Sequence, residues 1–175
     1  MGIRQRELDR LIKYAQGLDL KVSFISKNVE HAADWVIDGS EIRIYTKKNK
    51  SITDTILSLV HELGHHLWFI HKKERQPDLK FEEAIDRENL SSENIKPETP
   101  KHLRKKIYLV EKEGIQYWDV IVKDTNIKIA KWRIELQAEF DIWQYEYYYR
   151  YGSFPIKKLG KAKWKKLKKK HKGLK

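Results

Sequence analysis

The chain has 175 residues, a length that suits one domain with a sizeable hydrophobic core, and it contains no cysteine. The absence of cysteine excludes a disulfide framework, a zinc site with thiolate ligands and a cysteine nucleophile. The formal net charge is +12, but residues 157–175 hold eleven lysines and no acidic residue, so the rest of the chain has 26 basic residues (37 − 11) against 25 acidic ones. Only this Lys-rich segment therefore calls for an anionic partner.

The sequence shows no segment that would carry the chain into or across a membrane. Charged residues recur from Arg4 to Lys13, so no apolar signal-peptide core follows the first methionine. The densest apolar run, residues 56–60, is far shorter than the roughly 20 residues that a membrane-spanning helix needs. We therefore expect a cytoplasmic protein without a membrane span.

The first half of the chain alternates between helical and strand patterns. Apolar residues at helical spacing before Gly17, then short β-branched runs separated by a turn signal, predict its first elements. These are a helix over residues 3–16, a strand over 20–25, and a hairpin of strands over 34–37 and 41–45 around Asp38-Gly39-Ser40. Ser51 is a good N-cap, and Asp54 three residues later completes a capping box, so we expect a long helix from here to about Lys73.

The second half is mostly helical in pattern. In chain order it predicts a charged helix over residues 79–90, a surface loop over 91–100, a helix over 101–113 that ends near Gly114, a strand over 117–122, a turn at 124–126 and a long helix over 129–149. The fold class is therefore α+β. We expect a small sheet of three or four strands packed against the long helix after Ser51 and a second long helix late in the chain.

The sequence His61-Glu62-Leu63-Gly64-His65 lies inside the capped helix and carries the chemistry. Two histidines at i and i+4 share one helix face, so both imidazoles can bind one tetrahedral zinc ion. Glu62 is close enough to accept a proton from a zinc-activated water without being a ligand itself. Gly64 leaves room for close approach of a backbone or a substrate.

A catalytic zinc site needs a third protein ligand, and carboxylates are the best candidates. Glu135 lies on the aromatic-rich late helix, and Glu139, one turn further on, could hold a ligand imidazole in place. The rivals are Glu82 and Glu83 on the earlier charged helix. We expect His66 to be structural or exposed.

The stretch from Glu41 to His65, a short strand followed by a helix with His-Glu-Leu-Gly-His, resembles the ImmA/IrrE-type family of small gluzincin metallopeptidases. The later Glu135-Leu136-Gln137-Ala138, followed by Phe140, is similar to that family's Glu-x-x-Ala ligand motif. The resemblance implies a minigluzincin-like fold, zinc as cofactor, and a repressor or regulator protein as substrate. Because the gap between the two motifs is long, we place an insertion near residues 75–128 of a metallopeptidase-like domain over 1–156.

Two further features remain. Among the tyrosines after Glu139, Tyr147 is a candidate donor to the developing oxyanion, although such aromatic runs mostly serve packing. In the basic tail, residues 157–175, a helix would place Trp164, Leu167, His171 and Leu174 along one side. Such a segment either binds nucleic acid or another polyanion, or remains a solubilising tail.

Our hypothesis is a zinc metallopeptidase that cleaves a peptide bond in a cytoplasmic, regulatory protein, with Glu62 as general base. The alternative is a nucleic-acid-binding protein in which the metallopeptidase-like scaffold is stabilised by zinc and the tail binds the partner. A third hypothesis is a catalytically silent regulator that keeps zinc for stability. The presence of Glu62 argues against it, because a structural zinc site does not need this residue.

Overall fold

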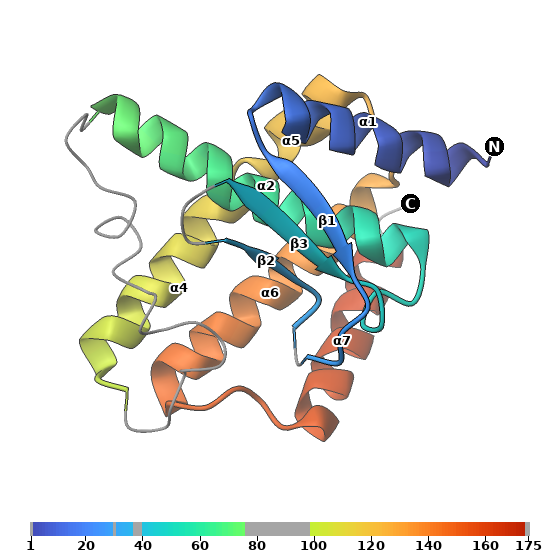
Figure 1. The fold of residues 1–175 in the computed structure, drawn as a ribbon. Helices are drawn as coiled ribbons and strands as arrows, with labels where there is room; N and C mark the ends of the chain where they lie inside the picture. Colours follow the sequence, from blue (N-terminus) through green and yellow to red (C-terminus); the bar gives the residue numbers. More distant parts are fainter. Residues whose placement is uncertain (1, 30, 37–39, 76–98, 174–175) are drawn as a thin grey trace. The chain divides into compact units, whose positions relative to one another are not determined.

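The computed structural model describes residues 2–29, 31–36, 40–75 and 99–173. These residues form two compact units (Figure 1). The first is drawn from residues 1–93 and 114–128, and the second from residues 94–113 and 129–175. The chain therefore leaves the first unit, returns to it for one short segment, and then completes the second.

The first unit contains a three-stranded mixed sheet in the order β1-β3-β2. Strand β3 (Glu41–Tyr45) lies in the middle, parallel to β1 (Lys21–Ile25) and antiparallel to β2 (Ala33–Trp35). The predicted strand and hairpin are therefore confirmed, although the turn residues 37–39 lie outside the described residues.

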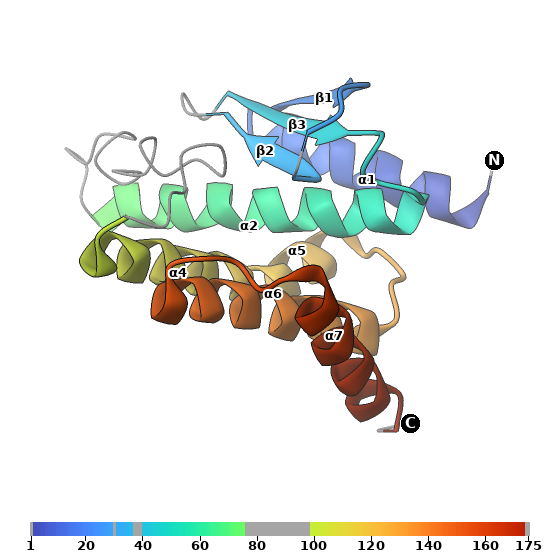
Figure 2. The same cartoon turned by 90° about the horizontal axis from the view of Figure 1, so that it is seen from below.

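Two helices cover one face of this sheet, and both were expected from the sequence. Helix α1 (Ile3–Gly17) packs against β1 and α2, while α2 (Ile52–Arg75) packs against β2 and β3. Figure 2 shows α2 running beneath the sheet. Ile42 and Ile44 of the middle strand are fully buried, as the alternation of apolar residues in this strand requires.

The start of α2 follows from its N-cap. The Ser51 hydroxyl accepts a hydrogen bond from the Asp54 backbone N–H at 3.1 Å, which satisfies one of the unpaired donors of the first turn. Behind the cap, Ile56, Leu59 and Leu63 are fully buried at helical spacing. The helix therefore forms because a capped start is followed by one continuous apolar face.

The predicted strand over residues 117–122 is wrong, because this segment forms helix α5 (Trp118–Thr125). Trp118, Ile121 and Thr125 are its buried residues, at a spacing of three and four that is helical and not alternating. The helix packs against α2 and ends at Asn126, which adopts a left-handed conformation (φ 50°). The β-branched composition of the segment was overridden by its packing against the rest of the unit.

The second unit consists of helices only, among the residues that the structure describes. It holds most of α4 (Lys101–Ile115), together with α6 (Lys131–Tyr151) and α7 (Lys157–Lys172). The rings of Tyr108 and Tyr149 stack at 5.9 Å and join α4 to α6. Gly152, with φ 77°, ends α6 in a left-handed conformation that favours glycine.

The coarse fold class is confirmed as α+β, with a small sheet packed on the long helix that carries the histidine motif. The helices expected over 101–113 and 129–149 are also confirmed, with small shifts at their ends. The helix expected over 79–90, and with it Glu82 and Glu83, lies outside the described residues. Within the described ranges, no helix combines the length and apolar character needed to cross a membrane.

Candidate metal centre

His61 and His65 of α2 point their outer ring nitrogens at one another. Their Nε2 atoms lie 3.1 Å apart, and the rings meet edge to face with centroids 4.8 Å apart. His61 is half-buried and His65 is buried. The helical spacing of four residues therefore brings both imidazoles to one point, as the motif predicts.

This arrangement fits a metal ion with nitrogen ligands. Two imidazole nitrogens that bind one zinc at about 2.0–2.1 Å in tetrahedral geometry lie about 3.3–3.4 Å apart. The separation of 3.1 Å differs from that value by only a few tenths of an ångström. Small ring rotations would therefore be enough to bring both nitrogens into ligand geometry.

Glu62 follows His61 on α2 and is half-buried. One residue along an α-helix turns the side chain by about 100°, so its carboxylate lies beside the histidine face and not on it. A half-buried carboxylate keeps access to a substrate water while the surrounding protein strengthens its electrostatic interactions. A general base next to two histidine ligands would occupy such a position on the helix.

The histidine pair sits where α2 makes an unusually close contact with the end of α4. A Cβ atom placed on Gly64 would lie 2.6 Å from the carbonyl oxygen of Gly114. A Cβ atom on Gly114 would in turn lie 2.7 Å from Nδ1 of His65. Both distances are too short for a real side chain, so the two glycines permit the close backbone approach that was expected at Gly64.

Trp118 is a neighbour of the pair that sequence reasoning missed. Its ring meets that of His61 edge to face at 5.7 Å, and its side chain is almost fully buried. The contact was not predicted because residues 117–122 were expected to form a strand. Read at helical spacing with Ile121 and Thr125, the tryptophan falls on the inner face of α5.

His66, next along α2, is structural, as expected. Its ring is buried and meets the Trp35 ring edge to face at 5.5 Å. Burial lowers the pKa of His66 to about 4, because the charged imidazolium would lose its hydration. The residue is therefore neutral near pH 7 and contributes packing to the contact between α2 and β2.

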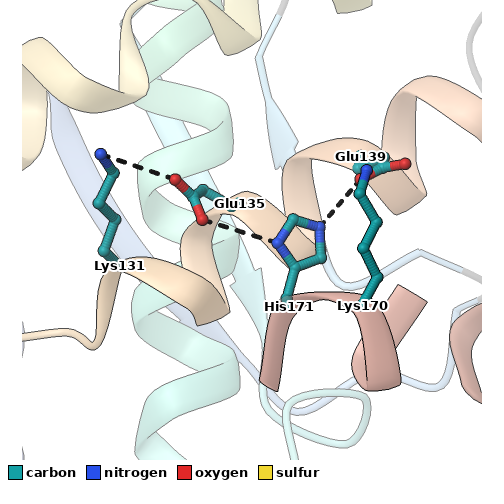
Figure 3. A network of polar contacts seen from close by, with 5 residues as sticks. All are labelled: Lys131, Glu135, Glu139, Lys170 and His171. Carbon is teal, nitrogen blue, oxygen red and sulfur yellow. Dashed lines mark hydrogen bonds and ion pairs between the residues drawn. The ribbon is translucent and has the colours of Figure 1, made fainter. Parts of the chain in front are cut away.

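Glu135 and Glu139 lie on α6 in the second unit, where both face a histidine of α7 (Figure 3). His171 places Nε2 at 2.9 Å from Glu139 and Nδ1 at 3.6 Å from Glu135. Lys170 donates a hydrogen bond to Glu139 at 2.6 Å, and Lys131 lies 3.7 Å from Glu135. Within this unit Glu139 therefore contacts the imidazole of His171, and its role toward a zinc-binding histidine stays a prediction.

Opposing effects act on the Glu139 carboxyl. Burial raises its pKa. The hydrogen bonds from Lys170 and His171 and their positive charges together lower the pKa by more than burial raises it, so the net pKa lies below the ordinary value. The ring of Tyr147, the candidate oxyanion donor, is tilted by 45° against the Tyr151 ring at a centroid distance of 4.5 Å and lies 6.0 Å from the Trp143 ring. These contacts are those of aromatic packing, and its catalytic role stays a prediction.

The structure thus brings His61 and His65 together on α2 with Glu62 beside them, while Glu135, Glu139 and Tyr147 belong to α6. The role of Glu135 as third ligand stays a prediction. No protein-family model, curated protein or solved structure matches the chain. Function is therefore inferred from the chemistry of the site.

Proposed function

We propose that this protein is a zinc-dependent metallopeptidase of the gluzincin type, similar to the ImmA/IrrE-type enzymes, that cleaves a peptide bond in a regulatory protein. The observation that carries the proposal is the convergence of the His61 and His65 Nε2 atoms at 3.1 Å on one helix face. The adjacent Glu62 favours a catalytic site over a structural one, because a structural zinc site has no use for a carboxylate that is not itself a ligand.

Zinc, when bound, would polarise the substrate carbonyl and lower the pKa of the attacking water. His61 and His65 would hold the ion, each as a neutral imidazole. Glu62 would accept the proton from the attacking water and deliver it to the amine of the leaving peptide. The buried surroundings of His65 would fix its ring and keep bulk water from competing.

For the third ligand we propose Glu111 of α4, which the sequence analysis did not consider. Gly114 on the same helix packs directly against the His65 ring, and Glu111 precedes it by three residues. Residues three apart share one helix face, so a continuous α4 directs Glu111 and Gly114 to the same side. The side chains of His61, His65 and Glu111 are a group that could hold a metal ion, and two imidazoles with one carboxylate are the ligand set expected of a gluzincin.

Glu111 was overlooked because nothing local marks it. It stands in Glu111-Lys112-Glu113, which has the pattern of an ordinary solvated helix face. Glu135 remains the alternative, supported by its similarity to the Glu-x-x-Ala motif. Within its own unit, however, the Glu135 carboxylate already faces Lys131 and His171.

The proposal is tested first by metal content and then by turnover. The purified protein should hold about one zinc per chain, and the His61→Ala/His65→Ala double variant should hold none. Glu62→Gln should retain the zinc and lose cleavage of a peptide library followed by mass spectrometry, because an amide cannot accept the proton. Stoichiometric zinc in the double variant, or undiminished cleavage by Glu62→Gln, would refute it.

The third ligand is tested by three single substitutions. Glu111→Gln should weaken zinc binding by roughly 10-fold or more, whereas Glu113→Gln, on the same helix but a different face, should leave it unchanged. Glu135→Gln is the decisive comparison. Loss of zinc affinity in Glu135→Gln with no loss in Glu111→Gln would assign the ligand to α6 instead.

A further inference from the structure

Helix α7 concentrates positive charge more strongly than any other described element. Its sixteen residues, Lys157–Lys172, include ten lysines and no acidic residue. It is nevertheless an ordered helix, docked by one side on α6. Its Leu167 and His171 are buried, and its Trp164 ring meets Phe140 edge to face at 5.0 Å.

The docking face uses only a few of these charges. Among the residues that the structure describes, α7 forms ion pairs only through Lys170 and His171, both with carboxylates of α6. Lys163 lies over the Trp143 ring at 5.6 Å and Lys172 over the Trp132 ring at 5.5 Å. Seven more lysines between Lys157 and Lys169 are exposed, and no described carboxylate neutralises them.

The exposed lysines share one broad face. At 100° per residue, Lys158, Lys161, Lys165 and Lys169 fall within about 80° of one another, on the side opposite Leu167 and His171. Three successive pairs of the series Lys157, Lys161, Lys165 and Lys169 stand at i,i+4, a spacing at which like charges destabilise a helix by a few tenths of a kcal/mol per pair. We define the lysine face as these exposed lysines from Lys157 to Lys169.

An anionic partner would relieve this repulsion, and the rest of the helix indicates which kind. A helix that inserts into a bilayer surface needs a free apolar face, but the apolar face of α7 is buried on α6. A single-strand platform needs free aromatic rings for base stacking, but Trp164, the only ring of α7 besides His171, is packed on Phe140. What remains is a rigid row of exposed lysines, from Lys157 to Lys169, about 18 Å long.

We propose that the lysine face of α7 binds the phosphate backbone of a nucleic-acid duplex without reading its sequence. A duplex presents closely spaced phosphates that several lysines of a straight helix can neutralise at once, with release of condensed counterions. The helix has no Arg, Asn or Gln, the side chains most suited to bidentate base contacts. This surface is independent of the proposed zinc site, so either assignment can fail alone.

The test uses the full-length protein and a labelled 20-base-pair DNA duplex of arbitrary sequence, with the dissociation constant measured by anisotropy at several salt concentrations. In the lysine-face variant, Lys158, Lys161, Lys165 and Lys169 are all changed to Gln, which keeps helix propensity. The matched control changes four exposed lysines of the first unit, Lys47, Lys48, Lys50 and Lys73, to Gln and so removes the same net charge.

We expect the lysine-face variant to bind at least about tenfold more weakly and its salt slope to fall by roughly 2 to 4, because each lost phosphate contact removes about 0.9 from that slope. The control should stay within about threefold of the unaltered protein, and circular dichroism should show equal helix content in all three. An equal loss in the control would overturn the proposal, since net charge alone would then explain binding.

Two further probes complete the test. The unaltered protein should bind the duplex more tightly than a single strand of the same length and more tightly than vesicles containing phosphatidylserine. Preference for the vesicles would assign the lysine face to a membrane surface, preference for the single strand would contradict the duplex, and no binding to any of the three would leave the lysines as a solubilising surface. Each of these outcomes overturns the proposal.

Discussion

Gly64 and Gly114 show how single positions control the candidate metal centre. They let the backbone of α2 and the end of α4 approach so closely that no side chain fits between them. The same contact holds the His65 ring, since Gly114 lies directly against it. Here the residue identities therefore determine both the packing of the helices and the position of the His65 ring.

The substitution Gly64→Ala tests this close approach. The added methyl group would lie 2.6 Å from the Gly114 carbonyl oxygen and 3.0 Å from Trp118 Cδ1, so backbone or ring must move. We expect the free energy of unfolding to fall by roughly 1–3 kcal/mol, measured from urea midpoints. Gly17→Ala is the control, because nothing lies within 4 Å of its Cβ position, and it should lower stability by no more than a few tenths.

His66 gives a prediction for pH. Its pKa is about 4 in the folded chain, below the ordinary 6.5, so the unfolded chain binds the extra proton first as the pH falls. The stability that depends on a neutral His66 is thus complete above about pH 6.5 and is lost progressively between pH 6.5 and 4. The loss amounts to about 3 kcal/mol at most.

The pH dependence is measured by urea unfolding after removal of metal with a chelator, so that protonation of the other histidines is common to both proteins compared. His66→Phe, which keeps a ring beside Trp35, should lose less stability than the unaltered protein between pH 7 and 4. Parallel pH profiles for the two proteins would show that His66 is not the residue responsible.

At the scale of elements, α7 illustrates how a highly charged segment becomes ordered. Its lysines repel one another, so the helix depends on what it buries against α6. Leu167 is 3% exposed and His171 is 7% exposed, and His171 is also held by the Glu139 carboxylate. The basic segment is thus part of the second unit and not a separate appendage.

Leu167→Ala should therefore unfold α7 from α6 or destabilise both. We expect a loss of roughly 2–5 kcal/mol in unfolding free energy, the usual cost of truncating a fully buried leucine. Leu159→Ala is the matched control, because Leu159 is 39% exposed and should cost well under about 1 kcal/mol. Helix content is measured by circular dichroism at 222 nm. Equal losses in the two variants would show that α7 is ordered without its docking on α6.

At the scale of the whole molecule, the first unit is built from two distant parts of the chain. The Glu7 carboxylate, buried on α1, accepts a hydrogen bond from the Lys128 backbone N–H at 2.7 Å. Arg4 donates to the Lys128 carbonyl oxygen, also at 2.7 Å, and Arg10 donates to the Asn126 carbonyl oxygen at 3.0 Å. The segment 114–128 is thus tied to α1 at its end and packed on α2 through α5.

A truncated chain tests whether this return segment is required. Residues 1–113 lack Trp118 and Ile121, two of the largest fully buried side chains, whereas residues 1–128 keep them. We expect the shorter chain to lack a near-ultraviolet circular dichroism signal and to bind no zinc. The longer chain should show a stronger near-ultraviolet signal and should bind more zinc. Native-like spectra from residues 1–113 would mean that α5 is dispensable for the first unit.

Most elements could be predicted from the sequence because their signals are local. The cap at Ser51, the apolar spacing of α2 and the stop at Gly17 each act within a few residues, and the structure has helices there. The segment over 117–122 could not be predicted in this way. Its β-branched residues favour a strand locally, and only burial of Trp118 and Ile121 makes it helical.

By itself the sequence determined the α+β class and the pairing of His61 with His65, because one helical turn is enough to bring residues four apart together. Only the tertiary structure decided that Gly114 and Trp118 enclose this pair, that β3 lies between β1 and β2, and that His171 docks on Glu139 thirty-two residues away. Such contacts join segments far apart in the chain. They depend on which buried surfaces fit together, and no local pattern of residues records that fit.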